Sequence, residues 1–169
     1  MKTLPDFDYV LTSLPRCGNG WLSALLSYGT QSTCYAEAYA RYLARGEVPV
    51  QPKGGVLGNA DPMYLLCPDD IACKKVVLVA RDEHQVASSM KKASMDIALL
   101  GKAVEGARQL IDAERIGLFI RYEDLMVGPS IRREYTAKRL WEYVLPDVPW
   151  DSAHWFRMNT LHVNPRSIT

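Results

Sequence analysis

The sequence predicts an α/β protein with three layers, in which a mostly parallel central sheet carries helices on both faces. Apolar, β-favouring runs alternate along the chain with segments whose apolar side chains recur at helical spacing. The run that ends at Ala80 is continuously apolar, which is typical of a strand covered on both faces. Strands separated by helices indicate a parallel sheet, and nothing marks a domain boundary, so residues 1–169 are expected to form a single domain.

Each element has its own signal. Strands are expected where the β-favouring runs occur, at residues 9–14, 74–80 and 116–121. Helices are expected at residues 21–26, 34–45, 83–92, 95–113 and 130–145, the second of them capped by the polar residues 31–33. In the last helix, the residues expected to face the core are Ile131, Tyr135, Leu140, Trp141 and Val144. Residues 46–62, rich in Gly and Pro, are expected to form a long surface loop, a feature that is often functional.

Composition excludes several classes of function. A formal net charge of +1 gives no argument for binding nucleic acid or an anionic membrane surface. The first residues lack the apolar core of a signal peptide, and no stretch is long enough to span a bilayer. The four cysteines, whose spacing is not that of a metal site, are Cys17, Cys34, Cys67 and Cys73. This spacing predicts reduced thiols, a cytoplasmic location and no bound metal.

The most informative stretch is residues 8–26, which read as a buried strand, a turn with two glycines and an amphipathic helix. Free N–H groups and the positive end of the helix dipole would point at one spot, where Arg16 adds a full charge. This arrangement predicts an anion site. The string GxxxxGK[ST] is absent, so the lysine and the magnesium-binding hydroxyl of an ATP-binding P-loop are missing.

Two more strands end in residues suited to the same site. Arg81 follows the second predicted strand and Tyr122 follows the third, as Arg16 follows the first. Parallel sheets bind ligands at the carboxyl ends of their strands. We therefore expect these three residues to line one ligand site.

Three segments resemble those of a known family, the sulfotransferases that use 3′-phosphoadenosine 5′-phosphosulfate (PAPS). LPRCGNGWL is similar to the loop that binds the 5′-phosphosulfate, whose usual form is Pro-Lys/Arg-Ser-Gly-Thr-Thr-Trp. KVVLVARDEHQVASSM resembles the segment that binds the 3′-phosphate through an arginine and, eight residues later, a serine. LFIRYEDLMVGP resembles a strand that ends in Tyr-Glu-Asp before a helix.

The resemblance implies a P-loop NTPase-like fold and transfer of a sulfuryl group from PAPS to a hydroxyl or amine, without a metal. The acceptor would be a small molecule or a glycan. Arg81 and Ser89 would bind the 3′-phosphate, and Tyr122 would contact the adenine. The phosphosulfate would be bound by residues 16–21, which are Arg16, Cys17, Gly18, Asn19, Gly20 and Trp21; of these, Trp21 is expected to lie mostly in the core.

The chain also departs from the family. Cys17, Asn19 and Gly20 replace hydroxyl residues of the loop, so backbone amides must contribute more of the phosphate contacts. The Arg-Lys-Gly loop that covers the 3′-phosphate in long members is absent, and Arg157 or Arg166 are candidates to replace it. Since the chain is short for the family, its acceptor pocket is expected to be abbreviated or completed by another subunit in a homo-oligomer.

Two residues are candidates for the general base that takes the acceptor's proton. Glu37 matches the family members that use a glutamate after the first helix, although it could instead form a surface pair with Arg41. His84 follows the 3′-phosphate strand, where a polar surface residue is the simpler interpretation. The sequence leaves both candidates open.

Two other functions stay open as well. A nucleotide or small-molecule kinase would fit an α/β fold, although the Walker lysine is missing. A catalytically silent module that binds PAPS or a nucleotide would fit the loss of hydroxyl groups from the loop.

Overall fold

A computed structural model of the chain describes residues 4–50 and 52–162. It is built on a five-stranded sheet in the order β2-β3-β1-β4-β5, and every pair of neighbouring strands is parallel. The strands are β1 (Tyr9–Ser13), β2 (Ser32–Ala36), β3 (Val56–Ala60), β4 (Lys75–Ala80) and β5 (Leu118–Arg121). The predicted parallel sheet is confirmed.

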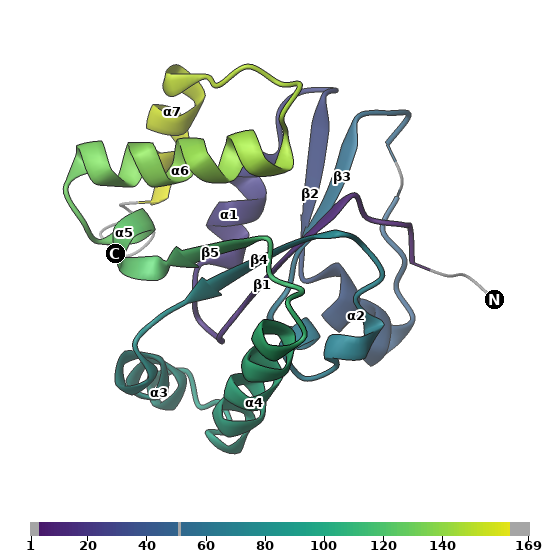
Figure 1. Cartoon of the computed structure of the whole chain (residues 1–169), viewed down its shortest axis with the longest axis vertical. Helices are drawn as coiled ribbons and strands as arrows, with labels where there is room; N and C mark the ends of the chain where they lie inside the picture. Colours follow the sequence, from purple (N-terminus) through teal and green to yellow (C-terminus); the bar gives the residue numbers. More distant parts are fainter. Residues whose placement is uncertain (1–3, 51, 163–169) are drawn as a thin grey trace.

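Helices cover both faces of this sheet, so the three predicted layers are confirmed (Figure 1). One face carries α1 (Asn19–Leu26), α6 (Ser130–Val144) and α7 (Ser152–His162). The other carries α2 (Ala38–Arg45), α3 (Glu83–Lys92) and α4 (Ala98–Asp112). The short helix α5 (Tyr122–Met126) joins β5 to α6, and two 3-10 turns, Pro62–Leu65 and Pro68–Asp70, join β3 to β4.

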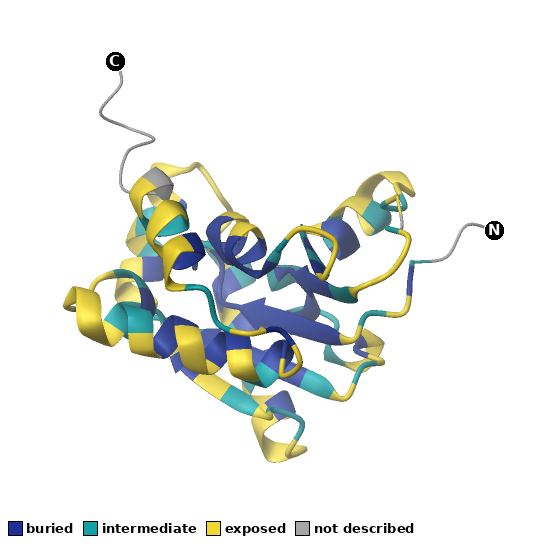
Figure 2. Ribbon diagram, turned by 90° about the horizontal axis from the view of Figure 1, so that it is seen from above, coloured by how far each residue is buried: buried dark blue, intermediate teal, exposed yellow. Residues whose placement is uncertain are grey.

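The core follows the central strands, which Figure 2 shows as a buried band between exposed helix surfaces. All five residues of β1 are buried, because α1 packs on one side of the sheet and the segment after β3 packs on the other. In α6 the predicted core positions Leu140, Trp141 and Val144 are fully buried. Ile131 and Tyr135 were wrongly expected in the core: they are 81% and 63% exposed, because the first half of α6 extends past the sheet.

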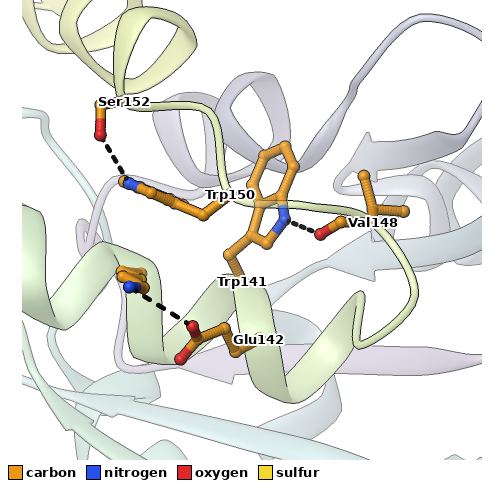
Figure 3. Close-up of polar contacts among 6 residues, drawn as sticks. Trp141, Glu142, Val148, Trp150 and Ser152 are labelled. Carbon is orange, nitrogen blue, oxygen red and sulfur yellow. Dashed lines mark hydrogen bonds and ion pairs between the residues drawn. The ribbon is translucent and has the colours of Figure 1, made fainter.

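A cluster of aromatic side chains joins α6 to α7 (Figure 3). The Trp141 indole donates to the carbonyl of Val148 at 2.7 Å, and Trp150 packs edge-on against Trp141 with ring centroids 5.6 Å apart. Tyr28 and His154 pack edge-on against the Trp141 ring from the α1 side. This cluster fixes the last helix, which the sequence reading had left out. The sequence feature that could have predicted α7 is Asp151, which caps this helix by accepting hydrogen bonds from the amides of residues 153 and 154.

Two strands were also missed. β2 and the junction at Glu37 occupy the first part of the helix expected at residues 34–45, and the supposed cap at residues 31–33 lies partly in β2. The loop expected at residues 46–62 contains β3. Gly58 and Asn59 conceal β3, because both residue types are depleted in strands. Gly58 is needed there, since a Cβ atom would lie 2.0 Å from the Tyr9 ring.

Candidate functional site

Strand order places a crevice at the carboxyl end of β1. The chain leaves β1 for β2 and β3 on one side of the sheet, and then crosses to β4 and β5 on the other. Connections that leave a strand in opposite directions open a ligand-binding crevice at its carboxyl end. A cavity of about 570 Å³ lies here, and each strand is followed by one of its lining residues, which are Pro15, Arg16, Gly18, Asn19, Gly20, Glu37, Pro62, Arg81, Ser89, Met95 and Tyr122.

The loop after β1 has a strained backbone. Arg16 and Gly18 both have left-handed conformations, with φ of 66° and 79°, a region that suits glycine but is rare for arginine. Gly18 stands at the N-cap of α1, so no capping side chain covers the first N–H groups of that helix. Backbone N–H groups at a helix start, together with the positive end of the helix dipole, favour an anion.

The structure brings the three predicted strand-end residues together. Arg81 donates from Nη1 to the carbonyl oxygen of Arg16 at 3.0 Å, and its guanidinium lies 4.3 Å from the centre of the Tyr122 ring. Arg16 donates from Nε to Oγ of Ser89 at 3.4 Å. Within the described residues, the buried Nε of Arg81 has no hydrogen-bond partner. The cluster therefore presents two guanidinium groups and a hydroxyl to one place.

A second hollow, a groove of about 440 Å³, continues from this cluster along α3. Arg81 and Ser89 line both hollows, so the groove is an extension of the cavity. The groove has basic and neutral side chains and no acidic residue among those that line it, which are Arg81, His84, Gln85, Ser88, Ser89 and Lys92. Lys92 escaped the sequence reading, although it follows Ser89 by three residues on a helix, a spacing that places both on one face.

Two residues of the predicted phosphosulfate loop turn away from the cavity. The Cys17 side chain is fully buried, and its burial raises the pKa of the thiol to about 12, so the thiol is neutral. Trp21 is only 7% exposed and donates from Nε1 to the carbonyl of Met158 in α7 at 3.0 Å. Neither side chain lines the cavity. A contact from residue 17 to a phosphate would therefore have to come from its backbone.

Asn19 and Gly20 do line the cavity, and the side-chain oxygen of Asn19 is already engaged. Its Oδ1 accepts a hydrogen bond of 3.0 Å from the hydroxyl of Ser13, and the residue is 6% exposed. Apart from its chain neighbours and the adjacent backbone of α1, no atom of the described residues would lie within 4 Å of a Cβ atom at Gly20, so there is open space at the first turn of α1. The backbone of this turn is thus the exposed donor surface of the loop.

The two candidate bases have different surroundings. Glu37 lines the cavity that contains Arg16 and Arg81, whereas His84 lines only the groove along α3. The sequence predicted Glu37 within a helix. In the structure, Glu37 is instead the single residue between β2 and α2. Within the described residues, its carboxylate makes neither a hydrogen bond nor an ion pair, so the alternative surface pair with Arg41 is not formed; the Arg41 amide donates to the Glu37 carbonyl at 3.1 Å.

Of the two residues proposed to replace the missing C-terminal loop, Arg157 lines neither the cavity nor the groove. Arg157 lies on the exposed side of α7, where its charge helps to lower the pKa of Asp151. Arg166 lies outside the described residues.

Among residues 4–50 and 52–162, no group of three His, Cys, Asp or Glu side chains could hold a metal ion. In the same part of the chain, no helix is long and apolar enough to cross a membrane.

No protein-family model and no curated protein sequence matches this chain. Solved structures do match it. Mouse sulfotransferase SULT7A1, in complex with PAP, superposes with a TM-score of 0.56 at 13% sequence identity, over 92% of this chain and 64% of the mouse chain. The chain has the sulfotransferase fold. A sulfotransferase from Alicyclobacillus acidocaldarius superposes with a TM-score of 0.53 at 10% identity, over 94% of this chain and 92% of the bacterial one.

The resemblance seen in three short segments is thus confirmed at the level of the fold. This chain spans less than two thirds of the mouse sulfotransferase, so a large part of that enzyme has no counterpart in it. The sulfotransferase fold of the chain agrees with the P-loop-like architecture expected from the sequence.

Proposed function

We propose that this protein is a sulfotransferase that moves a sulfuryl group from PAPS to a hydroxyl or amine of a small molecule or glycan. The product of the donor would be adenosine 3′,5′-bisphosphate (PAP). The observation that carries the proposal is the meeting of Arg16, Arg81 and Ser89 beside the uncapped start of α1. This cluster occurs in a fold shared with a sulfotransferase solved in complex with PAP.

The donor would lie across the two connected hollows. The 5′-phosphosulfate fits the cavity, where the amides at the start of α1 and the Arg16 guanidinium supply hydrogen bonds and positive charge. The 3′-phosphate fits the neighbouring groove, beside Arg81 and Ser89. The buried and unpartnered Nε of Arg81 supports this placement, because a bound phosphate oxygen would supply an acceptor for it. Tyr122 would hold the Arg81 guanidinium on its ring face.

Glu37 is the better placed of the two candidate bases. In the transfer step, the acceptor oxygen or nitrogen forms a bond to sulfur while the bond from sulfur to the bridging phosphate oxygen breaks. The acceptor's proton passes to the Glu37 carboxylate, and the electron pair stays on the phosphate oxygen, where Arg16 neutralises its charge. His84 would instead serve the groove, as a polar neighbour of the 3′-phosphate.

One observation favours the alternative of a silent binding module. The loop offers few hydroxyl donors, because Cys17 is buried and Asn19 and Gly20 stand where the family has hydroxyl residues. A module of this kind would bind PAP without catalysing transfer. A cytoplasmic location and a second subunit that completes the acceptor pocket also stay predictions.

Calorimetry with two ligands tests the proposed donor. Because charge-assisted hydrogen bonds contribute about 1.5–3 kcal/mol each, we expect PAP to bind roughly ten- to a hundredfold more tightly than AMP. Arg81→Ala should remove most of that preference and leave AMP binding nearly unchanged, since AMP lacks the 3′-phosphate. Equal affinities in the parent protein would contradict the assignment of PAPS.

Radiolabelled PAPS then separates the enzyme from the silent module. The parent protein is incubated with labelled PAPS and the small-molecule fraction of a cell extract, and the labelled product is identified. Tight PAP binding without any transfer of label would support the silent module.

A further inference from the structure

Glu37 has an unusual backbone for a residue on a cavity wall. Its φ and ψ of 57° and 36° lie in the left-handed region, although it is not a glycine. Such conformations persist only where the surrounding structure over-determines them, and they concentrate at functional sites. The part of the molecule that fixes Glu37 is the carboxyl end of β3.

Three consecutive residues at that end, 59–61, hold the start of α2. Each accepts a hydrogen bond from a different amide at this start: Glu37 N donates to Ala60 O (2.9 Å), Ala38 N to Asn59 Oδ1 (3.2 Å) and Ala40 N to Asp61 Oδ2 (2.8 Å). The first N–H groups of a helix are ordinarily capped by the side chain of the residue before it. Here β3 caps α2 from outside, and the Glu37 side chain makes no capping bond.

The two capping side chains are themselves fixed. Asn59 and Asp61 are both fully buried. The second carboxylate oxygen of Asp61 accepts from the amide of Met63 at 2.9 Å, and the Asp61 amide donates to the carbonyl of Leu11 in β1 at 2.9 Å. Asn59 donates from Nδ2 to the hydroxyl of Tyr64 at 3.4 Å. Asp61 therefore ties the start of α2 to β1, the strand that leads into the phosphosulfate loop.

We propose that Asn59 and Asp61 are positioning residues for Glu37. They cap α2 in its place, so that the Glu37 carboxylate stays free and faces the cavity beside Arg16. Neither residue lines the cavity, so they act through Glu37 and not on the ligand. This inference rests on the proposed function, in which Glu37 accepts the proton of the acceptor.

The variant Asp61→Asn tests the proposal, because Ala40 N and Met63 N donate to different oxygens of the Asp61 carboxylate and an Asn side chain retains only one of these oxygens. We expect kcat for label transfer from PAPS into the small-molecule fraction of cell extract to fall about tenfold or more, since small misplacements of a catalytic group are costly. PAP affinity, measured by calorimetry, should stay within about twofold of the parent because the donor contacts are elsewhere. In a Glu37→Gln background, Asp61→Asn should change kcat by no more than about twofold, because the group that it positions is already lost.

Asp8→Asn is the matched control. Asp8 accepts from the amide of Leu57 at 2.7 Å, so it also binds β3 through a carboxylate, but at the end of the strand remote from the cavity. If Asp61 has only a structural role, Asp61→Asn and Asp8→Asn should have equal kcat once they are compared at the same loss of thermal stability. That result would overturn the proposal. So would a loss of kcat on Asp61→Asn that is equal in the parent and in the Glu37→Gln background.

Failure of the proposed function has a different signature. A parent protein that transfers no label refutes the enzyme itself, and the positioning role with it. An active parent whose kcat is insensitive to Asp61→Asn refutes the positioning role alone. If Asp61→Asn does not fold, Asn59→Ala, which removes the acceptor of Ala38 N and the donor to the Tyr64 hydroxyl, is judged by the same criteria.

Discussion

The two sides of α1 differ in backbone strain and in the capping of the helix start. On the side of α7, the Trp141 indole, the His154 ring and the Tyr28 hydroxyl all have hydrogen-bond partners: Val148 O at 2.7 Å, Leu25 O at 2.8 Å and Asp151 Oδ2 at 2.9 Å. At the amino end of α1, the loop has two left-handed residues, the helix start lacks a side-chain cap, and Arg81 Nε is unpartnered within the described residues.

This difference separates a region that stabilises the fold from the proposed ligand site. Most buried polar groups are paired, and the exceptions among the described residues include Trp155 Nε1 on the α7 side as well as Arg81 Nε. The strained backbone of Arg16 persists in the proposed phosphosulfate loop because the well-packed remainder of the molecule holds it there. Substitutions on the two sides should therefore be distinguishable by what they change.

The largest effect on stability is expected from the aromatic side. Trp141→Ala removes a fully buried indole and should lower the free energy of unfolding by about 3–5 kcal/mol, a large share of a domain's stability. Urea unfolding followed by circular dichroism measures the change. PAP affinity of the folded variant should be nearly that of the parent, and a parallel loss of both would break the separation of the two regions.

On the ligand side, Arg16→Ala should slow sulfuryl transfer by about two or more orders of magnitude, the scale for one lost preorganised donor. Its thermal stability should hardly change, since an exposed side chain with a single 3.4 Å hydrogen bond is removed. Arg16→Lys should retain part of the rate, because the charge survives and only the planar geometry is lost. An unchanged rate in the alanine variant would contradict the role of Arg16.

A smaller effect is expected in the groove along α3. Lys92→Ala should weaken PAP binding by roughly threefold to tenfold, because one cation beside the proposed 3′-phosphate is lost, while AMP binding stays the same. The neighbour Lys91 is the control, since it has the same charge but does not line the groove. If Lys91→Ala and Lys92→Ala weaken PAP binding equally, Lys92 contributes only through the general positive charge of the surface and not through a contact in the groove.

The smallest expected effect is a pH dependence at the start of α7. The backbone amide of His154 and the Tyr28 hydroxyl lower the pKa of the Asp151 carboxyl. The unfolded chain then binds a proton more readily than the folded one, so the stabilisation is present above the ordinary pKa of about 4 and is lost as pH falls through the folded value. Thermal unfolding between pH 7 and pH 2 should show a shallower dependence in Asp151→Asn. Identical pH profiles would contradict this link.

The sequence alone determined the local parts of the site. A strand, a turn with two glycines and a helix follow one another at residues 9–26, so their hydrogen bonding and dipole depend on neighbours in the chain. The spacing of Arg81 and Ser89 was equally readable, because a strand end and the following helix have a fixed local geometry. For the same reason, α3 was predicted with the bounds that the structure shows.

Only the tertiary structure decided the rest. The strands β2 and β3 were not predicted. β3 contains Gly58, which is required only because the ring of Tyr9 packs against it, and β2 is separated from α2 by a single residue, so it resembled the start of a helix. Whether Glu37 or His84 faces the phosphosulfate loop depends on strand order, which places β3 between β2 and β1. The capping of α2 by Asn59 and Asp61 joins segments distant in sequence, and contacts of that kind leave no periodic signal in the sequence.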